Sequence, residues 1–128
     1  MRGTPAKTED GMAALEVAIL LPVVMLLFMM ILQAIVLFNG YHAAALGAAR
    51  GVDVAQALDG TPGAGATRAQ SVANQLGAFS GGVGASGSQP GDQVRIEVTG
   101  NVPSLFPGAP TLVSAVEFGP KERQPDPP

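Results

Sequence analysis

The chain has 128 residues, of which 47% are hydrophobic and 13% are charged, and its formal net charge is −3. This length allows one small domain at most, and so low a charge content is unusual for a soluble domain. The negative net charge and the lack of a basic patch argue against nucleic-acid binding, and the absence of cysteine excludes disulfides and thiolate metal sites.

The first distinctive pattern lies near the N-terminus, where Gly11 precedes Glu16 by five positions and a long apolar segment follows. None of the other four glutamates has a glycine five residues before it, so the pattern occurs once, at the edge of the apolar segment. It resembles the processing site of type IV prepilins. That resemblance implies cleavage after Gly11 by a prepilin peptidase, with residues 1–11 as a cytoplasmic leader and Met12 as the first mature residue.

An uncharged segment follows. No residue from 17 to 49 carries a formal charge, and Gln33 is the only polar side chain between Val17 and Phe38. Because about 20 apolar residues cross a bilayer as a helix, we expect a transmembrane helix over residues 12–38. The segment is longer than the roughly 7–15 apolar residues of a secretory signal peptide, and a plain signal anchor would leave Glu16 unexplained.

The basic residues predict the orientation of this helix. Arg2 and Lys7 precede it, and the next cation along the chain is Arg50. Positive charge favours the cytoplasmic side of a membrane span. We therefore expect a single-pass plasma-membrane protein whose N-terminus is cytoplasmic and whose C-terminal region is extracytoplasmic.

Two residues inside the span stand out. Pro22 removes one helix hydrogen bond and crowds the carbonyl of Ala18, which predicts a kink or a locally loosened turn that membrane helices tolerate. The alternative is that this segment melts during assembly. Gln33 is the one amide in the apolar run, and we expect it either to hydrogen-bond to another helix or to bond to its own helix backbone. The sequence leaves these alternatives open.

The helix is expected to continue outside the membrane over residues 39–60, because Tyr41–Leu58 is rich in alanine and contains no proline. The turn sequence Gly60–Gly63 should end it. Small side chains that recur every fourth residue let another backbone approach closely, which makes Gly47 and Gly51 predicted packing positions. The alternative is that the spacing merely reflects an alanine-rich composition. The small residues are Ala43, Gly47, Gly51 and Ala55.

Two stretches of this long helix resemble one family. The sequences AALEVAILLP (13–22) and AAALGAARG (43–51) are similar to those of the TadE-like pseudopilins of the type IV pilin superfamily, found in Tad/Flp tight-adherence pilus systems. The resemblance is specific over residues 11–51 and loose beyond them. It implies a membrane-inserted minor pseudopilin that works with other pilin subunits and the assembly machinery in pilus assembly and adherence. Many members have phenylalanine after the glutamate, where this chain has Val17, an aliphatic residue that preserves membrane burial.

The chemistry of these residues suits processing and assembly. Gly11 has no side chain, so a peptidase can hold its backbone in an extended form. After cleavage Met12 carries an ammonium group, and Glu16 lies one helical turn away. Because an unpaired charge in lipid is costly, Glu16 can set the register of subunits by neutralising the Met12 amine of a neighbour. The alternative is that Glu16 lies at the interface and reaches water.

Residues 61–118 are expected to form a small extracytoplasmic α+β region. Thr67 can cap a second helix that runs to about Phe79, and Ser80–Gly91, rich in glycine and serine, is interpreted as a flexible linker. The apolar residues at helical spacing, which should share one face of that helix, are Ala69, Val72, Ala73, Leu76 and Phe79.

Two strands should follow as an antiparallel pair packed on the second helix. Gln93–Thr99 alternates, with Val94, Ile96 and Val98 on one side. In the weaker strand Leu112–Phe118, the side chains expected on one face are Leu112, Val116 and Phe118. Residues 119–128 are expected to be a disordered tail.

No catalytic arrangement is evident in the sequence. His42 is the only histidine, the carboxylates lack the spacing of an acid–base pair, and the methionines of the span have no histidine or cysteine beside them to complete a metal site. We therefore expect neither an enzyme nor a cofactor, and no small-molecule substrate. The expected function is that of a minor Tad pseudopilin. The alternative is a single-span envelope protein, not processed at Gly11, whose small domain binds a partner.

Overall fold

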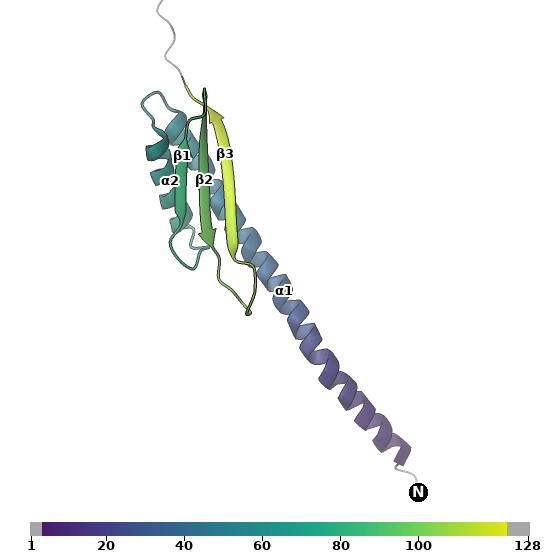
Figure 1. Ribbon diagram of the computed structural model, residues 1–128. Helices are drawn as coiled ribbons and strands as arrows, with labels where there is room; N and C mark the ends of the chain where they lie inside the picture. The colour runs from purple at the N-terminus through teal and green to yellow at the C-terminus, as the bar shows by residue number, and fades with distance from the viewer. Residues whose placement is uncertain (1–3, 123–128) are drawn as a thin grey trace, which may run out of the picture.

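The computed structural model describes residues 4–122, with side chains from Asp10 onward. A single long helix, α1, is followed by a second helix and three strands (Figure 1). The fold class is α+β, as predicted. The element bounds are α1 Thr4–Gln56, α2 Pro62–Gln75, β1 Gly84–Ser88, β2 Gln93–Asn101 and β3 Leu112–Pro120.

Helix α1 has two parts with different surroundings. Residues 10–28 are exposed throughout, whereas the buried positions of the helix begin at Gln33 and continue to Ala55. In the part of the chain that is described, α1 is the one helix long and apolar enough to cross a membrane, over Asp10–Gln56. It is continuous through Pro22, so the kink expected there stays a prediction.

The sheet packs one face on the second part of α1. Its strand order is β1-β2-β3, and both pairs are antiparallel. The side chains of Val94, Ile96 and Val98 are fully buried, as the alternation of β2 predicts. Helix α2 lies against β1 and β2 on the same face of the sheet, while α1 lies against β2 and β3 (Figure 1).

The predicted antiparallel pair is confirmed as β2 and β3, but the sheet has a third strand, and the prediction of a flexible linker before the pair was wrong. Gly84–Ser88, within that supposed linker, forms β1 and pairs with β2 from Thr99 to Arg95. Strand pairing uses backbone groups, so this segment of glycine, alanine and serine needs no apolar pattern to join the sheet. Its small residues serve packing, because a Cβ atom on Gly87 would overlap the carbonyl oxygen of Pro62 in α2.

The second helix begins earlier than predicted and ends earlier too. Thr61, not Thr67, is its N-cap: the Thr61 hydroxyl accepts a hydrogen bond from the backbone N–H of Ala64 at 3.0 Å, and Pro62 is the first helical residue. Thr67 lies inside α2 and donates its hydroxyl to the Gly63 carbonyl at 3.1 Å. A threonine followed by proline is a strong helix start, because proline needs no N–H partner at that position.

The face that α2 buries is narrower than predicted. Gly65, Ala69 and Ala73 are buried, whereas Leu76 is exposed and lies beyond the last helical residue. Phe79 is also outside the helix; its ring packs against Gly100 of β2, where a Cβ atom would lie 2.7 Å from the ring.

The larger side chains of β3 point away from the core. Leu112, Val116 and Phe118 do share a face, but it is the exposed one, and the strand buries Val113, Ala115 and Gly119 instead. Small residues are required on the inner face because the backbone of β3 runs close to α1. A Cβ atom on Gly119 would overlap the side chain of Val52.

The prediction that a disordered tail begins at residue 119 was wrong for Gly119 and Pro120, which belong to β3. Strand β3 runs to Pro120, and the Lys121 ammonium group donates hydrogen bonds to the carbonyls of Ala55, Ala57 and Gly60. A cation at the C-terminus of a helix satisfies carbonyls that lack helical partners and opposes the negative end of the helix dipole. Residues 123–128 of the predicted tail lie outside the described residues.

The strip of small residues on α1 packs against α2. A Cβ atom on Gly47 would lie 2.8 Å from the Ala69 carbonyl oxygen, and one on Gly51 would lie 2.6 Å from that of Gly65. Gly65 is in turn held against Gly51 and Ala55. The close backbone approach that the spacing predicted therefore occurs, and its partner is α2 of the same chain.

We predict that Gly51→Ala destabilises the domain. Alanine raises intrinsic helix stability by about 1 kcal/mol. Its methyl group would nevertheless meet a backbone oxygen that cannot move without displacing α2, and such overpacking costs about 1–3 kcal/mol. Thermal unfolding in detergent micelles, followed by circular dichroism, measures the difference.

Gly63→Ala is the matched control. A Cβ atom on Gly63 meets nothing closer than the Thr61 hydroxyl at 4.0 Å, so its melting temperature should equal or exceed that of the unaltered chain. A Gly51→Ala protein as stable as the Gly63→Ala protein would contradict the close packing of α1 and α2.

Candidate functional site

The residues predicted to take part in processing and assembly lie on the part of α1 against which the domain does not pack. Gly11, Met12, Glu16 and Pro22 are all exposed and helical. Met12 and Glu16 are one turn apart, a rise of about 6 Å along the axis. Met12 and Glu16 therefore share one face of α1, as the sequence predicts.

Glu16 has no cation beside it in the described part of its own chain. The ion pairs there join Arg50 to Asp53 at 3.7 Å and Arg95 to Glu97 at 2.7 Å. Glu16 is instead surrounded by exposed apolar side chains, among them Leu15, which is 62% exposed. Its carboxylate is the only charge that the helix carries between Gly11 and Ala49.

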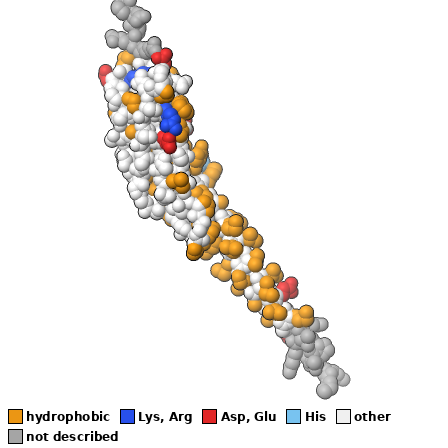
Figure 2. All heavy atoms as spheres, viewed as in Figure 1, with side chains coloured by type: hydrophobic (Ala, Val, Ile, Leu, Met, Phe, Trp, Pro, Cys, Tyr) orange, Lys and Arg blue, Asp and Glu red, His pale blue; other side chains and the backbone are white. Residues whose placement is uncertain are grey.

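The apolar surface of this part of α1 extends around the whole helix. Figure 2 shows hydrophobic side chains gathered along the segment that extends away from the domain. Ile19 and Phe28 are 60% and 58% exposed, and the residues between them are exposed as well. A helix that is apolar on every side must be covered by lipid or by other helices.

Gln33 marks the point at which the domain begins to cover α1. Its side chain is 2% exposed, and its amide group is fully bonded. Nε2 donates to the carbonyl oxygens of Pro103 at 3.2 Å and Pro110 at 2.8 Å, and Oε1 accepts from the backbone N–H of Leu105 at 3.0 Å. We call these three hydrogen bonds the Gln33 clamp.

The clamp differs from both alternatives that the sequence left open for Gln33. The partners are neither another helix nor the backbone of α1, but the loop between β2 and β3, residues 102–111. They are 70 to 77 positions away in the chain, so no local pattern identifies them. The one signal in the sequence was the amide itself, because a single polar group in an apolar run needs partners.

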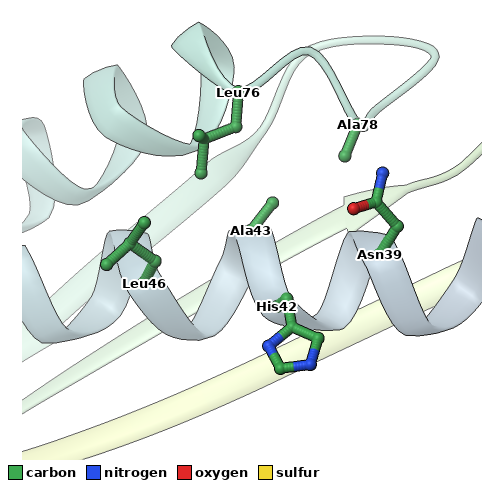
Figure 3. A pocket seen from close by; sticks show the side chains of 6 residues that line it. All are labelled: Asn39, His42, Ala43, Leu46, Leu76 and Ala78. Atoms are coloured by element: carbon green, nitrogen blue, oxygen red, sulfur yellow. The ribbon is translucent and has the colours of Figure 1, made fainter.

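A cavity of about 190 Å³ lies beside α1 near His42 (Figure 3). The His42 ring is turned away from Leu76 and Ala78 in that view, and it makes an edge-to-face contact with Phe38, with ring centroids 4.4 Å apart. None of the residues lining the cavity is a carboxylate or a nucleophile. They are Asn39, His42, Ala43, Leu46, Leu76 and Ala78. Among the described residues, His42 thus has a packing contact with Phe38 and no acid–base partner.

The described side chains do not form a metal site. From Asp10 to Glu122, no three histidine, aspartate or glutamate side chains lie close enough together to hold an ion. Two features of the described residues therefore have chemical specificity. One is the exposed face of α1 that carries Met12 and Glu16, and the other is the Gln33 clamp.

We predict that Gln33→Leu frees the β2–β3 loop. Leucine keeps the bulk of the side chain but leaves two carbonyls and one N–H without partners. Leaving such groups unbonded costs about 1–3 kcal/mol, which corresponds to roughly a tenfold or greater rise in the opening equilibrium of the loop. Hydrogen exchange at the Leu105 amide, measured in micelles, reports this opening directly.

Gln70→Leu is the control for this substitution, because Gln70 is exposed on α2. The Leu105 amide should exchange at the normal rate in that variant. Equal protection of Leu105 in the Gln33→Leu and Gln70→Leu proteins would show that the clamp does not hold the loop.

Comparison with known proteins identifies the N-terminal part of the chain. Residues 11–53 match the family model described as TadE-like protein. No curated protein and no solved structure matches the chain. The matched residues contain the processing pattern, the exposed apolar part of α1 and most of the part that the domain covers. The family suggests a membrane protein associated with a Tad pilus, and the resemblance of this chain to TadE-like proteins is confirmed over residues 11–53.

Proposed function

We propose that this protein is a minor pseudopilin of a Tad-type pilus, cleaved after Gly11 by a prepilin peptidase and incorporated through α1. The observation that carries the proposal is the apolar part of α1, which is exposed on all sides and begins at the Gly11–Glu16 pattern. The family match over residues 11–53 supports it. In this function the protein acts by assembling, and catalysis has no part.

Processing requires a local change in α1. Gly11 lies inside the helix, and a Cβ atom at that position would meet nothing within 4 Å. A peptidase that needs an extended backbone must unwind this turn. Glycine lowers the cost, because it stabilises a helix less than alanine by about 1 kcal/mol.

Glu16 is the residue that we propose for subunit register. It is exposed in the monomer and lies one turn from Met12, whose amine becomes the chain terminus after cleavage. Two such helices side by side can pair the carboxylate of one with the ammonium of the other. Within lipid both unpaired charges are costly, so the axial offset that pairs them is favoured over others.

The position of the domain suits this assembly. Because residues 10–28 are exposed throughout and the buried positions of α1 begin only at Gln33, residues 12–28 of several copies can lie side by side without interference from their own domains. The proposed partners are other pilin or pseudopilin subunits and the assembly machinery. The proposed orientation has the domain outside the plasma membrane and residues 1–11 in the cytoplasm.

Processing is tested by the intact mass of the membrane-extracted protein, with and without the prepilin peptidase of the host. We expect residues 1–11 to be lost only when the peptidase is present. Gly11→Val should keep its full mass in both cases, since a β-branched side chain at the scissile bond obstructs an extended, close-fitting backbone. Gly81→Val is the control and should be processed, because a Cβ atom there meets nothing within 4 Å.

A full-length mass for the unaltered chain in the presence of the peptidase would contradict the proposal. It would favour the alternative, an unprocessed single-span envelope protein with a partner-binding domain.

The role of Glu16 is tested separately, by Glu16→Gln. This variant should still be cleaved, but it leaves the Met12 ammonium of its neighbour unpaired. Removal of one partner from a buried pair costs about 3–5 kcal/mol, so the amount recovered in sheared pili should fall at least about a hundredfold. Immunoblots of the pilus and membrane fractions measure this ratio, with Glu122→Gln as the exposed control. Normal incorporation of the Glu16→Gln protein would mean that Glu16 only faces water.

A further inference from the structure

The loop between β2 and β3, residues 102–111, lies at the end of the domain where the exposed apolar part of α1 begins (Figure 1). We propose that this loop docks in the lipid bilayer, at the boundary between headgroups and acyl chains, as a second membrane contact beside α1. The inference requires that α1 spans a membrane, but it is independent of cleavage at Gly11 and of incorporation in a pilus.

The composition of the loop is unusual for a surface connection. Residues 102–111 include no charged side chain and contain three prolines together with Leu105 and Phe106. Leu105 is 40% exposed. Loops that face only water are rich in polar side chains, whereas apolar and aromatic residues beside a membrane span favour the interface.

The loop packs directly on the span. Phe106 and Pro110 line an apolar cavity of about 150 Å³ together with residues of α1 that precede and follow Gln33. The α1 residues lining it are Met30, Gln33, Ala34 and Leu37. The apolar surface of α1 and that of the loop are therefore continuous, and lipid that covers the first reaches the second.

Several polar backbone groups of the loop have hydrogen-bond partners within the protein, which a medium with little water requires. Unbonded N–H and C=O groups are costly there. The Gln33 clamp satisfies two carbonyls and one N–H of the loop, and the Val102 N–H donates to the Thr111 carbonyl at 2.9 Å. The Ser104 hydroxyl donates to the Phe106 carbonyl at 2.7 Å. The prolines contribute no N–H that needs a partner.

The length of α1 places the loop at the correct depth. From Met12 to Gln33 the helix rises about 31 Å at 1.5 Å per residue, and the hydrocarbon core of a bilayer is about 30 Å thick. If the helix enters the core near Met12, Gln33 and the loop lie at the opposite boundary. That boundary is the region in which a partly polar, partly apolar loop is most stable.

Depth-dependent fluorescence quenching in the full-length protein tests this proposal. The chain has no tryptophan, so each of the variants Leu105→Trp, Val23→Trp and Leu58→Trp reports from one site. Val23 lies midway between Met12 and Gln33 and is 50% exposed, and Leu58 is 55% exposed at the other end of the domain, between α1 and α2. Each protein is reconstituted in phosphatidylcholine vesicles whose acyl chains carry bromine near either the carbonyl end or the methyl end.

We expect bromine near the carbonyl end to remove most of the Leu105→Trp emission, and bromine near the methyl end to remove most of the Val23→Trp emission. Leu58→Trp should be quenched by neither. Unquenched Leu105→Trp overturns the proposal whatever its emission maximum; a blue-shifted maximum would then show that protein, and not lipid, covers the loop. Unquenched Val23→Trp overturns it as well, because α1 would then not span the bilayer.

Tryptophan itself favours the interface, so a second measurement uses a smaller probe. The chain has no cysteine, and Leu105→Cys and Leu58→Cys therefore give single-thiol proteins. A water-soluble maleimide should label Leu105→Cys many times more slowly than Leu58→Cys in vesicles, and at a similar rate after both proteins are unfolded in detergent. Equal rates in vesicles would overturn the docking of the loop in lipid.

Discussion

The apolar surface of residues 12–28 has to be covered, and the described part of the chain does not cover it. Every one of these positions is exposed, and none except Glu16 carries a charge. At about 25 cal/mol per Å² of apolar area, contact of this surface with water is strongly unfavourable. The rest of the structure follows from this constraint: the domain packs on the second part of α1 and leaves the first part free for lipid or for other helices.

The domain depends on α1 because it has no thick core of its own. The buried cluster consists of alanines and valines with a single isoleucine, Ile96, and α1 supplies four of its members. Glycine at the α1–α2 contact brings the two backbones together where larger side chains would hold them apart. The many small residues of the domain thus allow α2 and the sheet to pack close to α1, as a thin layer along the helix. The α1 members of the cluster are Ala44, Ala48, Val52 and Ala55.

Predictions from the sequence were most successful where the residues that form a pattern belong to a single helix or strand. The uncharged segment after Glu16, the strip that includes Gly51, and the alternation of β2 each depend on residues close together in the chain, and each was predicted. Pairings between distant segments were not: β1 joins the sheet through its backbone, and β3 buries its small residues because α1 lies against them. The partners of Gln33 could not be predicted either, since they lie on a loop 70 to 77 positions away.

The Gln33 clamp also bears on Glu16, although the two residues are far apart on the same helix. The clamp holds a polar loop backbone against α1, and such a backbone is not tolerated in the hydrocarbon core where lipid can reach it. If α1 spans a bilayer, as proposed above, the apolar layer therefore ends near Gln33. From Val17 to Leu32 the helix rises only about 23 Å, less than the roughly 30 Å of a hydrocarbon core. A core of that thickness extends back to about Met12, and it draws the Glu16 carboxylate about one turn inside. The position of the domain thus gives a physical reason for a partner at Glu16, whose carboxylate would lie in the monomer at the edge of lipid with no cation described beside it. The Met12 amine that the proposed cleavage would create on a neighbouring helix reaches this depth when the two helices are offset by about one turn, or about 6 Å.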